Sequence, residues 1–187
     1  MLSGSQLNQL IERTEIEFSG AVRGDALLLT LGSHLLEFAA AGHVIKPWDS
    51  KSASAAYAAP CVDWEEYDLH ALTSVIISVH ERLRLSNNIG GAIGTLSHLA
   101  RLGLFAHFAS PFVDRGFEGH LALELFNASP NTLRLRRGMP MAKLLLWPVE
   151  GEPPHHGQEG ASVYSSKPDS IIDLRSQFWR EFGEGET

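Results

Sequence analysis

The sequence predicts a mainly β protein, folded as a distorted barrel or a sandwich of short strands. From position 105 to 149, apolar segments of about four to eight residues alternate with turns, in the regular succession that such folds require. The stretch LTSVIISVHERLR (72–84) is rich in β-branched residues, and Val75, Ile77 and Val79 fall on one face of a strand. Both observations favour antiparallel strands around one core.

The length fits one domain. With 187 residues, 44% of them hydrophobic and 20% charged, the chain has the balance of an ordinary globular domain. We expect a single domain over residues 1–187, with its core at about 20–149 and a flexible tail at 150–187, where Pro, Gly and His are frequent.

The first third of the chain predicts a helix, a strand pair and a long loop. In Ser5–Arg13, apolar residues recur at spacings of three and four, which indicates a short amphipathic helix with Ser5 as its N-cap. Residues Ala26–Phe38 suggest a strand, a turn or bulge at Gly32, and a second strand. The Ala/Ser-rich stretch 39–63 has no clean period, so we expect a loop that wraps the surface or meets a partner subunit.

The rest predicts strands around one short internal helix. We interpret IGGAIG (89–94) as a turn and Thr95–Leu104 as the helix, ending at Gly103. The following strands are predicted in AHFA, FVD, GHLALELFNAS and TLRLRRGMPMAKLLLWPV, and a last helix at about Ile171–Phe182.

Charge and composition exclude several classes of function. A net charge of −7 argues against a general nucleic-acid coat, because there is no basic stripe to neutralise phosphates. The single cysteine, Cys61, excludes an internal disulfide and a cysteine-rich zinc site. No apolar run approaches the ~20 residues that cross a bilayer, and the N-terminus has no signal-peptide pattern. We therefore expect a cytoplasmic protein without nucleic-acid or membrane partners.

Four residues between positions 97 and 124 could form a catalytic site. Ser97 and Arg101 are spaced to share a helical face, and Asp114 lies in the turn VDRGFEG. Glu124 lies inside the apolar strand LALELFN, where it points away from both neighbouring leucines, so one of the two faces must be interior. If Glu124 is on the buried side, desolvation raises its pKa, as a general base requires.

These segments resemble a known family. SHLARLGL, VDRGFEGHLALELFN and LRRGMPMAKLLL are similar, in order and spacing, to the core of the dCTP deaminases, which belong to the dCTP deaminase/dUTPase superfamily. The resemblance extends over about residues 72–147. It implies a distorted, jelly-roll-like β-barrel of the dUTPase type and a homotrimer with active sites at subunit interfaces. It also implies hydrolytic deamination of a deoxycytidine nucleotide to the deoxyuridine nucleotide and ammonia.

The resemblance assigns a role to each matching residue. Glu124 is expected to be the catalytic base that activates a water molecule. Arg101 is expected to orient Glu124 and this water, and Ser97 to hydrogen-bond the water. Asp114 is expected to accept from the deoxyribose hydroxyl, with His107 and Ser110 near the base. His98, Tyr164 and Lys167 are the remaining expected substrate contacts. The resemblance implies no catalytic metal or other catalytic cofactor, and Mg²⁺ only with the nucleotide phosphates.

Three departures from the family pattern leave alternatives open. In the tail, Tyr164 matches a family tyrosine, but the family's glutamine three residues later is Lys167 here. The family's first helical arginine is Leu96 here, and its second serine is His98. An arginine at that place makes charge-assisted phosphate contacts, about twice as strong as neutral hydrogen bonds. The ligand is then a triphosphate held unusually, a mono- or diphosphate, or a modified nucleotide. The alternatives to a deaminase are a dUTPase-type pyrophosphatase and a catalytically idle nucleotide-binding regulator.

Two further patterns have structural interpretations. The arginines of RLRRG (134–138) are expected on the outer face of a strand and its turn. The pair His155-His156 lacks a third ligand, so we assign no metal site to it or to the dispersed remaining histidines.

Overall fold

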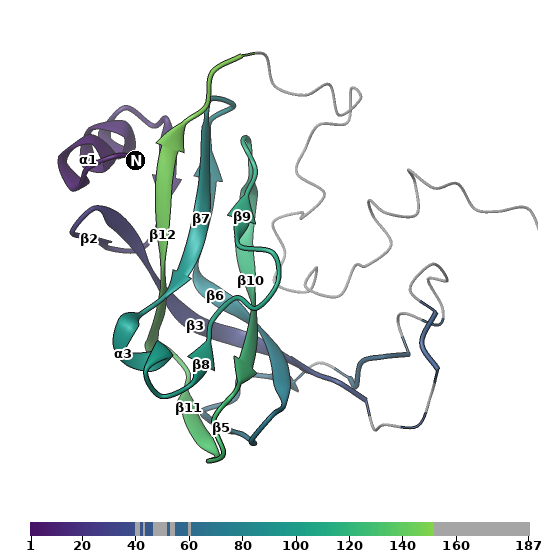
Figure 1. Ribbon diagram of the computed structural model, residues 1–187. Coiled ribbons are helices and arrows are strands. Elements are labelled where there is room, and N and C mark those ends of the chain that lie inside the picture. The colour runs from purple at the N-terminus through teal and green to yellow at the C-terminus, as the bar shows by residue number, and fades with distance from the viewer. Residues whose placement is uncertain (40–41, 43, 47–51, 53–54, 60, 152–187) are drawn as a thin grey trace, which may run out of the picture.

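The computed structural model describes residues 1–39, 42, 44–46, 52, 55–59 and 61–151, and its main feature is a strongly curled antiparallel sheet (Figure 1). Along the sheet the strands follow the order β8-β10-β6-β3-β12-β7-β9, with β1 added to β6, and β2 and β4 to β3. Strands β5 and β11 form a separate two-stranded sheet. The prediction of a mainly β, barrel-like fold is confirmed.

The elements have the following bounds: α1 Gly4–Glu12, β1 Ile16–Phe18, β2 Val22–Arg23, β3 Ala26–Glu37, β4 Cys61–Val62, β5 Glu66–Leu69, β6 Ser74–Leu85, β7 Ile89–Thr95, α3 Ser97–Ala100, β8 Leu104–Phe105, β9 Phe112–Val113, β10 Glu118–Asn127, β11 Leu133–Arg136 and β12 Pro140–Pro148.

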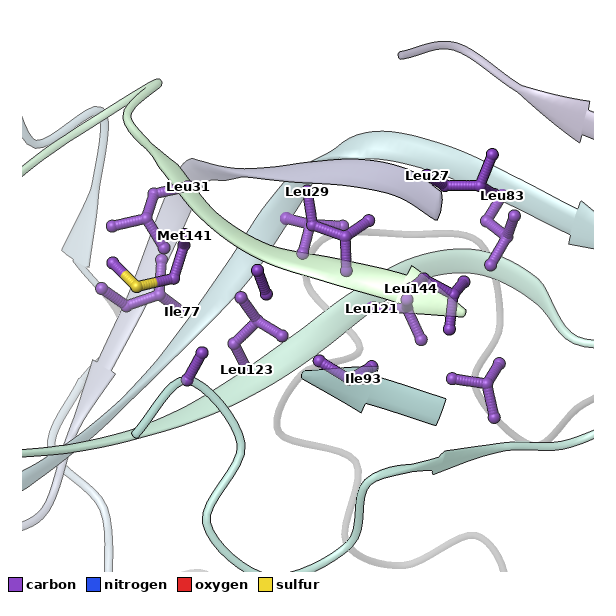
Figure 2. Close-up of a cluster of buried hydrophobic side chains, with 14 of the residues drawn as sticks. Leu27, Leu29, Leu31, Ile77, Leu83, Ile93, Leu121, Leu123, Met141 and Leu144 are labelled. Atoms are coloured by element: carbon purple, nitrogen blue, oxygen red, sulfur yellow. The ribbon is translucent and has the colours of Figure 1, made fainter. Parts of the chain in front are cut away.

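The core lies inside the curl of the sheet, where the long strands turn alternate side chains toward one another (Figure 2). Strand β6 buries Val75, Ile77 and Val79, the face that the sequence predicts. Strand β10 buries Leu121, Leu123 and Leu125, and β3 and β12 add further leucines from the other side. This inward alternation fixes which residues remain on the outer face.

The N-terminal helix is confirmed, but its predicted cap is wrong. The N-cap is Ser3, whose side chain accepts from the Gln6 amide, while the Gln6 side chain accepts from the Ser3 amide. This reciprocal pair is a capping box, which needs a Gln or Glu three residues after the serine. Ser5 has no such partner at Asn8.

Strand β3 is continuous through Gly32, so the predicted turn there is wrong and the predicted bulge is correct. The register of β3 against β6 shifts between Leu31 and Leu35. A Cβ at Gly32 would lie 2.8 Å from the carbonyl oxygens of Ser78 and Val79, so the two backbones come too close for any side chain.

The segment IGGAIG is not a turn but most of β7, which lies between β12 and β9. The helix after it is much shorter than predicted, four residues in α3, although Gly103 does terminate the turn that follows it with φ +85°. The AHFA segment is not a strand; the chain pairs one step earlier, in β8.

The predicted loop 39–63 is partly paired. Cys61 and Val62 pair with β3, and Tyr57 forms a bridge with Phe38. The predicted C-terminal helix and most of the tail lie outside the described residues. No helix in the described part of the chain is long and apolar enough to cross a membrane.

Candidate functional site

Glu124 lies on the outer face of β10. Its neighbours Leu123 and Leu125 are fully buried in the core, so alternation turns the carboxylate to the opposite side. There it lies beside Ile76 of β6. Of the two orientations that the sequence allows, the structure has the leucines inside, and the Glu124 side chain is 42% exposed in the single chain.

Among the residues that the structure describes, His107 is the basic group nearest to this carboxylate. Its side chain is only 9% exposed, and its Nδ1 lies 4.0 Å from Glu124 Oε2. Burial lowers the pKa of His107, against the opposing effects of the Glu124 charge and a hydrogen bond with the backbone of Ser110. The ring is therefore neutral at neutral pH.

Three phenylalanines form an apolar wall beside Glu124. Phe126 follows it by two residues on the same face, and its ring centroid lies 4.9 Å from that of Phe108 and 6.4 Å from that of Phe105. Phe105 and Phe108 remain 46% and 60% exposed. A half-exposed carboxylate bordered by exposed aromatic rings can be desolvated by a ligand or by another subunit.

Tyr57 approaches the same carboxylate from the segment before β4, and sequence analysis missed it. Its ring packs against Phe38 with centroids 5.1 Å apart. Burial, together with the negative charge of Glu124, raises the pKa of Tyr57. The aperiodic Ala/Ser-rich sequence around Tyr57 contains no signal that could place it there.

The end of β10 also anchors the segment that follows α3. Strand β8 pairs with β10, Phe105 opposite Phe126 and Leu104 opposite Asn127. Asn127 is fully buried; its Nδ2 donates to the carbonyls of Leu69 and Asn131, and its Oδ1 accepts from the amide and hydroxyl of Ser129. Asn127 is thus a structural residue that fixes the turn after the strand.

Helix α3 carries the predicted site residues Ser97 and His98, and Arg101 is its C-cap; all three are exposed. Leu99 anchors this short helix in the core. Within the described ranges, Arg101 and Ser97 make no hydrogen bond or ion pair with Glu124. Asp114 and Ser110 are likewise exposed, and the two predicted tail residues, Tyr164 and Lys167, lie outside the described residues.

Leu96, which replaces an expected arginine, packs against the hydrophobic core. Its amide donates to the Met141 carbonyl at 3.1 Å, and it occupies the N-cap of α3 without a side-chain capping bond. At position 96, where the family has an arginine, this chain therefore has a side chain that packs against the core and cannot bind a phosphate.

The arginine run 134–137 is engaged in ion pairs. Arg134 makes two bonds to Asp68, at 2.7 and 2.9 Å, and Arg136 pairs with Glu66 at 2.9 Å across the β5–β11 ladder. Arg137 pairs with Asp63 and Glu65. These contacts confirm the structural interpretation of the run. In the described part of the chain, no three His, Cys, Asp or Glu side chains gather as metal ligands do.

Comparison with known proteins identifies the family. A family model described as dCTP deaminase-like matches residues 1–149, so the chain belongs to the dCTP deaminase-like family, as the resemblance predicts. The dCTP deaminases of Pyrobaculum calidifontis and Pyrobaculum neutrophilum are 30% and 32% identical over 161 residues, which cover 84% of this chain and 89% of each relative. The "dCTP deaminase, dUMP-forming" of Nanoarchaeum equitans is 31% identical over 108 residues, 58% of this chain and 52% of that protein.

A solved structure supports the same fold. The 2′-deoxycytidine 5′-triphosphate deaminase from Agrobacterium tumefaciens aligns with a TM-score of 0.61 at 16% identity. The alignment covers 80% of this chain and 48% of that one, so this chain spans about half of its length.

Proposed function

We propose that this protein is a deaminase of a deoxycytidine nucleotide, dCTP or a close relative, with Glu124 as the base. The observation that carries the proposal is the outward Glu124 of β10, which lies between two inward leucines and beside a buried neutral histidine and an apolar aromatic wall. The family membership and the names of relatives about 30% identical support the substrate class.

The reaction needs a base because cytosine C4 is a weak electrophile. Glu124 takes one proton from a water molecule as its oxygen forms a bond to C4, and returns that proton to ring nitrogen N3. Further proton transfer to the exocyclic amine lets the C4–N4 bond break, and ammonia leaves while the uracil carbonyl forms. Arg101 orients the carboxylate, and Ser97 hydrogen-bonds the water. An enclosed pocket strengthens these interactions because water no longer screens them.

The nucleotide is held by the remaining predicted residues. Asp114 accepts from the deoxyribose hydroxyl, and Ser110 lies near the base. Because Leu96 packs against the core, phosphate contacts are left to His98, Lys167 and Tyr164, and to the Mg²⁺ that accompanies the phosphates of the substrate. The enzyme works as a homotrimer in the cytoplasm, with the active sites between subunits.

A test of the proposal measures ammonia release from dCTP and dCMP with the wild type and Glu124→Gln. We expect the amide to keep the half-exposed side chain and the fold, but to lower kcat by about 10²–10⁴-fold, because it cannot accept the proton. Glu118→Gln is the matched control: Glu118 begins the same strand, is exposed and pairs with Arg82, so its loss leaves kcat unchanged.

The products decide between the deaminase and its alternatives. Pyrophosphate from dUTP without ammonia from any cytosine nucleotide indicates a pyrophosphatase, and nucleotide binding without turnover indicates a regulator. Release of both ammonia and pyrophosphate from dCTP adds a second step, as the name of the Nanoarchaeum equitans relative, dUMP-forming, suggests. Turnover retained in Glu124→Gln removes the proposed base.

A further inference from the structure

His107 Nδ1 is a buried polar atom without a hydrogen-bond partner among the residues that the structure describes. The 9% exposed ring points this nitrogen toward Glu124, whose Oε2 is 4.0 Å away. A buried nitrogen left unpaired costs free energy, and such groups in native proteins call for an explanation.

The separation of the two atoms suits a small group between them. At 4.0 Å they are too far apart for a direct hydrogen bond. A single oxygen about 2.8 Å from each would see them at an angle of about 90°, near the angle between the two O–H bonds of water. The gap is thus the size of one bridging water.

The protonation state of the ring decides what that group must be. Burial keeps His107 neutral, and its hydrogen bond goes to the backbone of Ser110. In the neutral tautomer that carries its hydrogen on Nε2, Nδ1 has a free lone pair. Two acceptors, the lone pair and the carboxylate, then face a group that must donate to both.

We propose that His107 Nδ1 and Glu124 Oε2 together bind the attacking water, so that His107 is a catalytic residue and not a base-reading one. The inference rests on the proposed function. Glu124 accepts the proton that is transferred, Nδ1 accepts the hydrogen that stays on the oxygen, and the oxygen lone pair is thereby aimed at C4. His107 itself neither gains nor loses a proton in this step.

The residues around His107 and Glu124 are mostly apolar or neutral. Strand β6 places Ile76 beside Glu124, and β8 places Phe105 beside Phe126, both apolar. Tyr57 stays a neutral phenol, because burial and the charge of Glu124 raise its pKa. His120 and Glu118 lie further along β10, with Glu118 paired to Arg82.

Two substitutions of His107 test the proposal. Asparagine carries a carboxamide atom near the position of Nδ1, and glutamine carries one near Nε2. We expect His107→Asn to keep kcat within about tenfold of the wild type and His107→Gln to lose about 10²-fold or more, with little change in KM in either, because the water and not the nucleotide loses its contact.

The matched control is His120→Asn. His120 is a part-buried histidine on the same face of β10, and its Nδ1 lies 3.3 Å from the Val79 carbonyl. We expect His120→Asn to leave kcat unchanged. Thermal unfolding of all three variants separates lost chemistry from lost folding.

The pH profile of the wild type gives a second measurement that needs no variant. Protonated His107 cannot accept from water, so its protonation stops the reaction and log kcat falls at acid pH. Because the pKa of His107 is lowered, this fall begins below the ordinary histidine range near ~6.5. In His107→Asn, which has no ring to protonate, the fall in log kcat at acid pH is expected to be less steep than in the wild type.

The outcomes separate this inference from the function on which it rests. Wild-type deamination that Glu124→Gln abolishes, with kcat of His107→Gln unchanged, overturns the water-binding role alone. Variants that raise KM at constant kcat also overturn it, and show that His107 contacts the nucleotide. A wild type that releases no ammonia from any cytosine nucleotide removes the proposed function itself.

Discussion

Glu81 is a buried carboxylate that the sequence does not distinguish from the exposed acids around it. It occupies an inward position of β6, between Val79 and Leu83, and is 4% exposed. Its two oxygens accept from one residue, the amide of Thr30 at 2.9 Å and the hydroxyl of Thr30 at 2.6 Å. Glu81 thus supplies the acceptor for a β3 amide next to the bulge at Gly32.

We predict that Glu81→Ala lowers the free energy of unfolding by about 1–3 kcal/mol, because the half-buried Thr30 amide and hydroxyl lose their acceptor. Glu81→Gln is expected to cost less, since its amide oxygen can still accept from Thr30. Urea unfolding at neutral pH checks both. Equal losses in the two variants would show that the charge, and not hydrogen-bond acceptance, is what the site needs.

At the scale of the element, β7 shows what the sequence pattern could not predict. Glycine occupies positions 90, 91 and 94 of this strand, which is typical of a turn, yet the strand lies inside the sheet, between β12 and β9. A Cβ at Gly91 would lie 2.6 Å from Leu146 Cδ2 and 2.7 Å from the Leu145 carbonyl oxygen. Here glycine permits close approach of β12 and does not serve flexibility.

We predict that Gly91→Ala destabilises the protein by about 1–3 kcal/mol, as overpacking does. Gly94→Ala is the matched control in the same strand, because a Cβ there meets nothing within 4 Å. The control is expected to be neutral or to stabilise by up to about 1 kcal/mol, through the reduced freedom of the unfolded chain. Thermal unfolding of the pair gives the comparison. A similar melting temperature in both variants contradicts the tight packing of β7 on β12.

The elements that the sequence did predict are those with a clear alternation. In β6 and β10 most inward positions are apolar, with Glu81 and Asn127 as buried polar exceptions, so the two faces of each strand follow from the pattern. The pattern left open which face of β10 is interior, and the structure places Glu124 on the outer one. Strands β8 and β9 have only two residues each, too few to show a period, so their pairing depends on tertiary contacts. The family resemblance places His107 near the base, but the approach of its Nδ1 to Glu124 also depends on tertiary contacts and could not be predicted.

At the scale of the whole molecule, a single chain leaves the proposed site open. Ser97, Arg101 and Asp114 are exposed, and so are the rings of Phe105 and Phe108 next to Glu124. Enzymes that share a site between identical subunits close it by symmetry, each subunit supplying one half. The proposed trimer accounts for both the exposed aromatic wall and the separation of α3 from the carboxylate.

We predict that two inactive variants restore activity when their subunits are mixed. If Glu124 and Arg101 of different subunits meet in one site, random exchange between Glu124→Gln and Arg101→Ala subunits restores about one quarter of the sites. The measurement is ammonia release after reversible dissociation, with each variant alone taken through the same treatment as control. Light scattering should give about three times 20.5 kDa for the native protein. A trimer without recovered activity places both residues in the site of one subunit, and a monomer with full activity removes the shared site.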